Sequence, residues 1–411
     1  MKRTKQILQP QYMNSFSCIG SACEDTCCAG WRITIDQETY KKYKRVRDPE
    51  MKPLFNKILK RNRSNVTKEN YARILMDENG VAPCLNKDGL CSIQLKLGEE
   101  YLSHTCAVYP RMSSKVNDIW EQSATTSCPE IARLALLNPN RMEFDYISKT
   151  IDEKLLKGQK INTENVSNTE KKYFWELRIF VIALLQNREY SIEERLIILG
   201  IFCDNIQEYI EEKKINELPN LISLYNQMLN NRLFDKELSN ITTNHVVQIK
   251  ILNQVLKMRL TNIVHKRYIE CLKEVSEALG YETEDKPGID FITRYQTIYQ
   301  KYYRPFMEQH EYIYENYLVN YVVKNLFPFE DQYTIFGNYQ MMVIHYALIK
   351  LHLIGMAGYH REDFNPEHII KLIQSFGRVV EHNSSYLQSV YELLKKNNYN
   401  TMLYMAMLIK N

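Results

Sequence analysis

Cysteine carries the clearest chemistry in this sequence, since eight of its ten cysteines lie before residue 130. Even scatter along the chain would place only about three there. The eight candidate metal ligands are Cys18, Cys23, Cys27, Cys28, Cys84, Cys91, Cys106 and Cys128. Turn-forming residues such as Gly20, Gly30 and Gly89 accompany them. Thiolates that several turns bring together suit zinc or an iron–sulfur cluster, so the sequence predicts a metal-binding module.

The cysteine spacing leaves the metal and the grouping open. The first four cysteines read C-x4-C-x3-C-C, which matches neither a zinc ribbon, a ferredoxin run, nor the C-x3-C-x2-C spacing of radical enzymes. Eight thiolates suffice for two four-ligand sites, or for one cluster with spare ligands. Adjacent side chains of an extended segment point to opposite sides, so we expect Cys27 and Cys28 to serve different sites, or only one to be a ligand. The alternative is that all eight pack as buried reduced thiols.

Composition and charge exclude several classes of protein. With 45% hydrophobic and 25% charged residues among 411, the chain is not disordered. A net charge of +4 is too small to indicate nucleic-acid binding, and 13 glycines are too few for a Gly-rich all-β fold or a large nucleotide-binding α/β domain.

Targeting signals are also missing from the sequence. The basic start is followed by polar residues where a secretory signal needs an apolar core. The most apolar segment, 341–356, contains His345, Lys350 and His352, so we expect a buried helix and no transmembrane segment. We therefore expect a cytoplasmic protein, and in a reducing compartment clustered cysteines bind metal or do redox chemistry more often than they form disulfides.

The elements that would position the cysteines are short and irregular. We predict a mainly α protein, in which a Cys-rich module with short strands (1–140) packs on an α-helical body (141–411). Within the module we expect a strand over 31–36, helix over 37–63, strands and turns over 81–109, and a helix from Pro129 to Leu137. Residues 140–168 resemble a charged connector with one helix. The helices predicted for the body cover 170–186, 192–213 with a capping box at Ser191, 218–229, 244–279, 290–309, 311–326, 337–356, 366–376 and 386–409.

Several separated motifs resemble one known family. They are Cys18-x4-Cys23-x3-Cys27-Cys28-x2-Trp31, Pro83-Cys84-Leu85, Leu90-Cys91, Thr105-Cys106, Tyr109-Pro110-Arg111, Cys128-Pro129-Glu130, Arg195-Leu196 and Glu315-Asn316-Tyr317. Together they resemble the bacterial flagellin lysine-N-methylases over nearly the whole chain. The cysteine pattern alone is also similar to a wider group of small zinc- or iron-chelating proteins.

The resemblance implies a cytoplasmic enzyme that methylates lysine ε-amines of flagellin. It further implies S-adenosylmethionine as the methyl donor and a [4Fe–4S] cluster held by cysteines, with zinc as a second or alternative metal. The helical body would bind flagellin and the donor, with no nucleic acid involved; the oligomeric state stays open. The competing hypothesis is a non-enzymatic interaction protein stabilised by zinc or iron.

The residues themselves give few pointers to the donor site. No G-x-G pair occurs, so a Rossmann-type loop does not hold the donor. A cluster held by three cysteines would leave one iron free to help hold the donor; otherwise the cluster is a structural clamp and the donor binds among the helices. Arg111, after Tyr109-Pro110, is our candidate for the donor carboxylate.

The acceptor lysine must lose its proton before it can be methylated. The tyrosine-rich stretch 302–321 could line a pocket for it, with Tyr317, Glu315 and Asn320 as candidate catalytic residues. The alternative is that this stripe packs in the core. We expect Cys203 and Cys271 to pack in the core, and His345 and His352 to have structural roles. His104 is a further candidate metal ligand.

Overall fold

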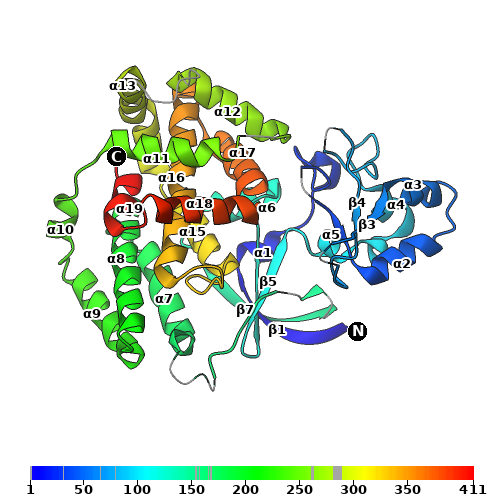
Figure 1. Ribbon diagram of the computed structural model, residues 1–411, viewed down its shortest axis with the longest axis horizontal. Helices are drawn as coiled ribbons and strands as arrows, with labels where there is room; N and C mark the ends of the chain where they lie inside the picture. Colours follow the sequence, from blue (N-terminus) through cyan, green and yellow to red (C-terminus); the bar gives the residue numbers. More distant parts are fainter. Residues whose placement is uncertain are drawn as a thin grey trace.

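Helices make up most of the protein, and two small sheets lie in its N-terminal part (Figure 1). The structure is a computed structural model that describes residues 2–411, apart from 31, 65, 79, 153–154, 157, 165, 167–168, 261–262 and 281–288. The N-terminal elements are β1 (Lys2–Pro10), α1 (Tyr12–Ser15), β2 (Thr34–Ile35), α2 (Gln37–Arg45), α3 (Met51–Ile58), β3 (Leu59–Arg61), β4 (Ala72–Ile74), α4 (Ser92–Leu97), α5 (His104–Val108), β5 (Arg111–Val116), β6 (Ile119–Ala124), α6 (Pro129–Leu136), β7 (Phe144–Asp152) and β8 (Lys160–Ile161).

The helical body follows from residue 174. Its helices are α7 (Phe174–Leu185), α8 (Ile192–Glu211), α9 (Leu218–Asn230), α10 (Asp235–Ser239), α11 (His245–Lys257), α12 (Lys266–Leu279), α13 (Ile289–Ile298), α14 (Arg304–His310), α15 (Tyr312–Lys324), α16 (Ile335–His360), α17 (Pro366–Phe376), α18 (Ser384–Lys396) and α19 (Met402–Ile409). Two π-helical turns, Tyr299–Tyr303 and Gly377–Glu381, follow α13 and α17. The mainly α fold class with short strands is confirmed.

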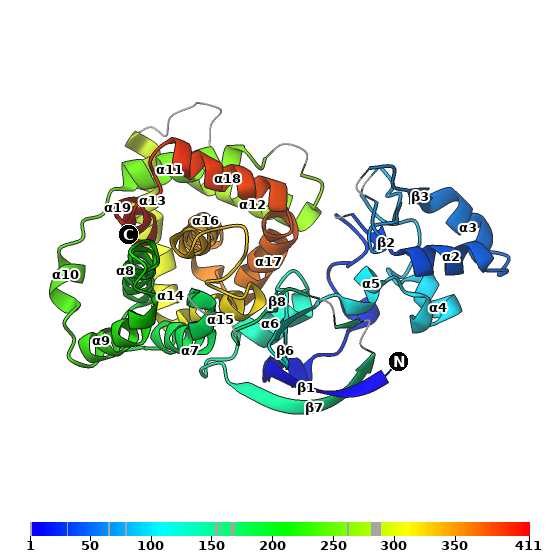
Figure 2. The same cartoon turned by 60° about the horizontal axis from the view of Figure 1, so that its bottom comes forward.

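Helix α16 forms the centre of the body, with other helices around it (Figure 2). Every residue from Ile335 to Ala357 is buried, because the helix is apolar on all sides and packs against α8, α12 and α17. It begins where the Thr334 side chain accepts a hydrogen bond from the Gly337 amide. A segment that starts with this helix, Ile335–Asp363, is long and apolar enough to cross a membrane, but nearly all of it is buried inside the protein. The prediction of a buried core helix is confirmed.

The larger sheet joins the N-terminus to residues beyond 140. Its strand order is β7-β1-β6-β5-β8, and β1 pairs with β7 in antiparallel fashion along its whole length. Figure 2 shows these two strands side by side below the body. The residues that the structure describes within 140–168 contribute β7 and β8 in place of the expected helix, while 153–154, 157, 165 and 167–168 lie outside the described residues. The boundary at residue 140 stays a prediction, although strands from both sides of it form this sheet.

A separate lobe, residues 17–109, projects from the sheet and body and is called the Cys lobe here (Figure 1). Its small core centres on Tyr43 and Phe55, whose rings stack with centroids 4.1 Å apart. The antiparallel sheet β2-β4-β3 covers this core. Residues 37–63 contain two helices and strand β3 in place of continuous helix. The predicted strand at 31–36 is observed as β2, while Trp31 lies outside the described residues.

Candidate functional site

Four cysteines of the Cys lobe gather into a first thiol group, consisting of Cys27, Cys28, Cys84 and Cys91. The Cys28 thiol is hydrogen-bonded to the thiols of the other three. Backbone pairing holds the segments together: the Ala82 amide donates to the Cys28 carbonyl (2.8 Å), and the Ser92 amide donates to the Cys84 carbonyl (2.8 Å). Cys27 contacts Cys28, so their side chains do not point to opposite sides; that they serve different sites, or that only one is a ligand, stays a prediction. The backbone turns at this pair, so the alternation of an extended strand does not apply.

The thiols of the first thiol group differ in the direction in which their pKa values are shifted. Hydrogen bonds from Cys28 and Cys84 lower the pKa of Cys91, and a hydrogen bond to Cys28 lowers that of Cys27. The same contacts raise the pKa of Cys28. Thiolates are the form in which cysteine binds metal, and a cation among these four would replace the shared protons.

Cys106 lies beside this group without a hydrogen bond to it. Burial raises the pKa of the Cys106 thiol to about 12, and the thiol interacts electrostatically with Cys27 and Cys91. It sits in α5, where the Ser103 hydroxyl accepts from the Cys106 amide at the N-terminus of the helix. The neighbouring His104 amide donates to Asp36 (3.3 Å). His104 as a metal ligand stays a prediction.

The remaining three cysteines form a second thiol group, consisting of Cys18, Cys23 and Cys128. Each of Cys18 and Cys23 interacts electrostatically with Cys128. Cys128 caps α6, and burial raises the pKa of its thiol to about 11 against the opposing effect of amide donors at the helix start. The structure thus divides the eight cysteines into a group of four with Cys106 beside it and a group of three.

The donor chemistry of both groups fits a soft metal or an iron–sulfur cluster, because thiolates are the preferred ligands of both. The positions of the side chains fit a metal ion less well than their chemistry does. Within the described residues, no three His, Cys, Asp or Glu side chains are arranged to hold a metal ion. In the first group the thiols bond to one another rather than surround a common point, so binding a metal would require them to shift.

The loop between the two groups is fixed to the helical body by buried polar contacts. Asp25 accepts hydrogen bonds from His265 (3.0 Å) and Gln374 (2.6 Å), which lie on the segment before α12 and on α17. Arg378 donates to the carbonyl of Ala29 (2.8 Å) and to that of Thr26. These contacts set the loop that carries Cys23, Cys27 and Cys28 against the body, and we call them the loop clamp.

Arg111 lies at the start of β5, on the side of the second thiol group. Its guanidinium stacks over the Phe16 ring, 4.9 Å from the centroid, and interacts electrostatically with Cys18 and Cys128. Burial lowers the pKa of Arg111. The side chain lines a cavity of about 350 Å³, called here the larger cavity. The other residues lining the larger cavity are Val108, Met112, Ser113, Ser114, Leu155, Gly158, Gln159, Lys324, Asn325, Leu326 and Glu330.

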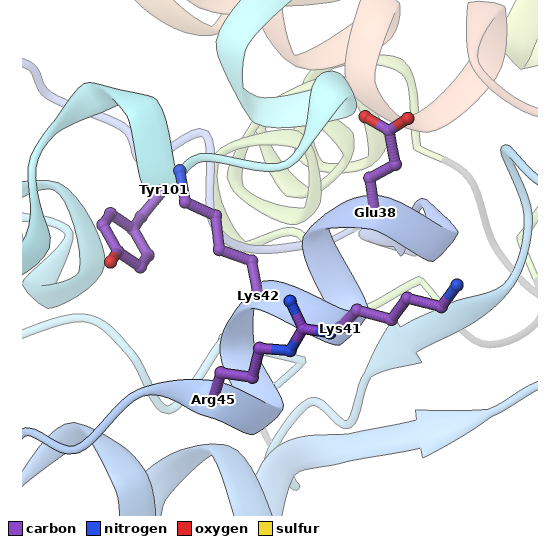
Figure 3. A pocket seen from close by; sticks show the side chains of 5 residues that line it. All are labelled: Glu38, Lys41, Lys42, Arg45 and Tyr101. Carbon is purple, nitrogen blue, oxygen red and sulfur yellow. The ribbon is translucent and has the colours of Figure 1, made fainter.

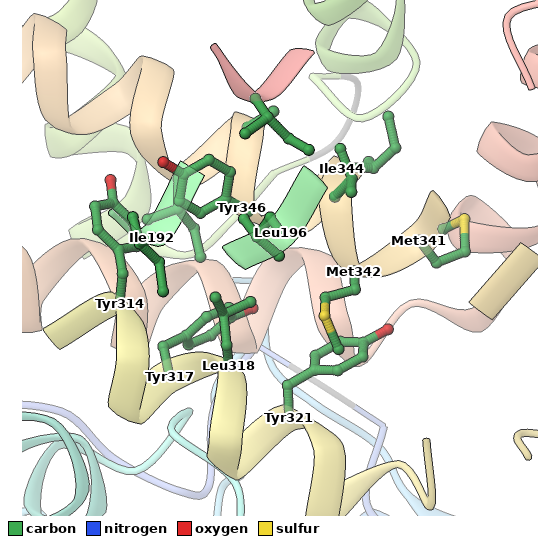
Figure 4. Close-up of a cluster of buried hydrophobic side chains, with 14 of the residues drawn as sticks. Ile192, Leu196, Tyr314, Tyr317, Leu318, Tyr321, Met341, Met342, Ile344 and Tyr346 are labelled. Carbon is green, nitrogen blue, oxygen red and sulfur yellow. The ribbon is translucent and has the colours of Figure 1, made fainter. Parts of the chain in front are cut away.

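A smaller cavity of about 60 Å³ adjoins the larger one. Its lining residues are Tyr321, Lys324, Asn325, Glu330, Tyr333, Met341, His345, Glu381 and Leu387. Because Lys324, Asn325 and Glu330 line both cavities, the two are neighbours across these residues. Figure 4 shows the adjoining packing, with Tyr321 of α15 beside Met342 of α16.

The three catalytic candidates on α15 differ in their surroundings. Glu315 is buried and bonded to Arg188 (2.8 Å) and Arg195 (2.9 Å). Asn320 accepts from the Tyr12 hydroxyl (2.7 Å) and donates to the Ala124 carbonyl (3.1 Å), so it ties the body to the sheet. The contacts of Glu315 and Asn320 therefore hold elements of the fold together. Tyr317 alone of the three contacts a residue of the cavities, because its hydroxyl donates to Glu381 (2.7 Å).

Sequence reasoning missed the polar residues of the smaller cavity. Glu381 is buried and paired with Lys324, and His345 is buried in α16. Burial alone would raise the pKa of Glu381, but the Lys324 charge, the neighbouring His345 and the hydrogen bonds from Lys324 and Tyr317 together lower it to about 2. Burial also lowers the pKa of His345 to about 4. A histidine in an otherwise apolar helix was the available signal, but sequence spacing did not distinguish His345 from His352.

A third hollow lies on the outer face of the Cys lobe (Figure 3). It measures about 410 Å³ and is lined by Glu38, Lys41, Lys42, Arg45 and Tyr101. The Lys42 ammonium lies 4.0 Å from the centre of the Tyr101 ring. The hollow lacks buried polar side chains, so its basic residues form a solvated helix face.

Comparisons with known proteins bear on the body that carries the smaller cavity. Residues 178–408, which include Lys324, His345 and Glu381, match the FliB lysine N-methylase C-terminal domain. The chain belongs to this family. Among its relatives are lysine-N-methylases of Salmonella typhimurium (strain LT2) and Salmonella choleraesuis (strain SC-B67), each 26% identical over 390 residues, or 92% of this chain and 92% of the relative.

A further relative of this chain carries a flagellar name. The flagellar biosynthetic protein FliU of Salmonella muenchen is 35% identical over 139 residues, which cover 33% of this chain and 80% of FliU. No solved structure matches the chain.

Proposed function

We propose that this protein methylates lysine ε-amines of flagellin in the cytoplasm, with S-adenosylmethionine as the methyl donor. The observation that carries the proposal is the FliB lysine N-methylase match over residues 178–408, which covers all nine residues that line the smaller cavity. The relatives named lysine-N-methylase and FliU support lysine as the acceptor and a flagellar protein as the substrate.

The larger cavity is our proposed donor site. Its volume of about 350 Å³ is within the usual range for small-molecule pockets. Arg111 offers a guanidinium that suits the donor carboxylate. Glu330 and the aromatic rings of Tyr321 and Tyr333 border the junction with the smaller cavity, where they favour the positively charged sulfonium.

We further propose that the thiol groups hold a [4Fe–4S] cluster, with zinc as the alternative metal. The second group, Cys18, Cys23 and Cys128, offers three thiolates and lies next to Arg111. A cluster held by three cysteines would supply an iron without a thiolate, able to ligate the amino-acid end of the donor. The first group would then hold a second metal or stay a reduced thiol cluster.

The residues that line the cavities would promote the reaction by positioning the amine and the methyl donor. Methyl transfer requires the amine nitrogen, the methyl carbon and the sulfur in line, and positioning of this kind supplies much of the rate. The buried site also strips water from the amine, which favours its neutral, nucleophilic form. Tyr317 supports this arrangement through Glu381.

Mass spectrometry of flagellin co-expressed with and without the protein tests the reaction. We expect lysine-containing peptides heavier by one or more methyl groups only when the protein is present, and Arg111→Met should weaken binding of S-adenosylmethionine at least tenfold. Unmodified flagellin in both cultures would disprove the proposed function.

Purification without oxygen tests the metal separately. We expect a brown protein with bound iron and labile sulfide, and Cys128→Ser should lower the iron content. Stoichiometric zinc without colour would overturn the iron–sulfur assignment. Zinc together with unmodified flagellin would favour the metal-stabilised interaction protein.

A further inference from the structure

We propose that the smaller cavity receives the side chain of the substrate lysine, and that His345 accepts a hydrogen bond from its amine. The inference rests on the proposed function and assigns the acceptor site within it. His345 is 3% exposed, and neither ring nitrogen has a hydrogen-bond partner among the residues that the structure describes. A buried polar group without a partner costs stability, and this one borders a cavity in which a ligand could supply the partner.

The second histidine of α16 shows the contrast. His352 is also fully buried, but its Nε2 pairs with the Tyr268 hydroxyl (3.1 Å) and its Nδ1 with the Leu348 carbonyl (2.6 Å). His352 therefore has its hydrogen-bonding needs met within the fold. The two histidines lie on the same helix, share burial and each border a cavity, so the difference between them is that His345 has no hydrogen-bond partner among the described residues.

The size of the smaller cavity suits the end of a lysine side chain. Its volume of about 60 Å³ accommodates about four water-sized groups, at roughly 15 Å³ each. Four such groups correspond to the last two methylenes, the nitrogen and one methyl group. Glu330, Tyr333 and Leu387 are partly exposed, whereas Tyr321, Met341 and His345 are buried. The mouth therefore lies among the partly exposed lining residues, which include Leu387, and an entering amine would reach the buried His345.

Lys324 and Glu381 place charges of opposite sign beside the cavity, so the loss of water on entry, rather than a net charge, favours the neutral amine. Burial keeps His345 neutral, with a lone pair free to accept an N–H. The ionised carboxylate of Glu381 and the face of Tyr321 then stabilise the positive charge that the nitrogen gains.

The transfer step balances without a further reagent. The amine lone pair forms the N–CH3 bond, the CH3–S bond breaks, and its electron pair stays on sulfur. The donor leaves as a neutral thioether, and the lysine leaves as a methylammonium that loses its proton to water. The hydrogen bond to His345 orients the lone pair toward the methyl group, so His345 contacts the reacting atom.

The matched variants His345→Leu and His352→Leu test the role of His345. For His345→Leu we expect a fall of at least tenfold in kcat/KM for flagellin, unchanged affinity for S-adenosylmethionine, and a melting temperature equal to or above that of the wild type, because an unpartnered polar group is removed. His345→Gln, which keeps an acceptor, should recover part of the activity. His352→Leu should lower the melting temperature and leave kcat/KM of the folded protein unchanged.

A second variant keeps the inference testable if His345→Leu does not fold. Leu387→Trp narrows the mouth at a partly exposed position, and we expect it to weaken flagellin affinity at least tenfold without altering donor affinity. Wild-type kinetics in His345→Leu, unchanged flagellin affinity in Leu387→Trp, or a loss of donor affinity in either would overturn the inference. A wild-type protein that leaves flagellin unmodified would instead disprove the proposed function itself.

Discussion

The buried pair of Lys324 and Glu381 shows how single residues set the properties of the smaller cavity. Their side chains are 9% and 4% exposed, and Glu381 also accepts from Tyr317. An ion pair withdrawn from water holds its partners firmly, because removing one leaves the other charged and unsatisfied. The pair therefore fixes where α15 meets the π-helical turn after α17.

The variant Glu381→Gln should be strongly destabilising. We expect the free energy of unfolding to fall by about 3 kcal/mol, since Lys324 would remain buried without a countercharge. Urea denaturation measures the change. The control Glu308→Gln removes a partner of Arg304 in a pair whose side chains are 60% and 55% exposed, and it should cost less than about 1 kcal/mol. Equal losses of unfolding free energy in the two variants would contradict the larger cost assigned to breaking the buried ion pair.

At the scale of the element, α16 combines an apolar sequence with two buried histidines. Burial lowers the pKa of both His345 and His352 to about 4. In the unfolded chain a histidine takes up a proton near pH 6.5. The folded state therefore binds fewer protons below that pH, and stability is lost as the pH falls from 6.5 toward 4.

This linkage predicts a measurable acid sensitivity. Each histidine should cost up to about 3 kcal/mol of unfolding free energy across that range, at about 1.4 kcal/mol per pKa unit. Urea denaturation between pH 7.5 and 4.5 should give a shallower decline in His352→Gln than in the wild type. Identical declines would show that His352 is protonated in the folded protein.

Elements with strong periodicity or caps were predictable, and those that depend on distant partners were not. The capping box of Ser191 and Glu194 is observed at the start of α8. Strand β7 was missed because charged and polar residues interrupt its apolar ones, and its strand conformation depends on pairing with β1. The division of the cysteines was unpredictable because contacts between distant segments bring Cys28 to Cys84 and Cys18 to Cys128.

At the scale of the whole molecule, the loop clamp links the Cys lobe to the helical body. Arg378 is 5% exposed and reaches carbonyls on the far side of the interface. Asp25 is held by residues from two separate segments of the body. The cysteine positions therefore depend on helices that follow them by more than 200 residues.

Breaking the clamp should loosen the Cys lobe while the body stays folded. We expect Arg378→Met to reduce bound metal per chain at least twofold and to speed proteolysis within 17–109, because buried charge-assisted hydrogen bonds are lost. Metal analysis and timed trypsin digestion measure these effects. The control Arg232→Met removes an exposed ion pair with Asp235 and should change neither. Unaltered metal content in Arg378→Met would show that metal binding does not depend on the contacts between the Cys lobe and the helical body.

The pairing of β1 with β7 has a consequence for synthesis on the ribosome. Strand β1 leaves the exit tunnel before its partner, which is translated more than 130 residues later. At 5–20 residues per second, that interval is on the order of ten seconds. During it the nascent chain holds an unpaired edge while the whole Cys lobe emerges, so a chaperone or an early metal supply would act in this window.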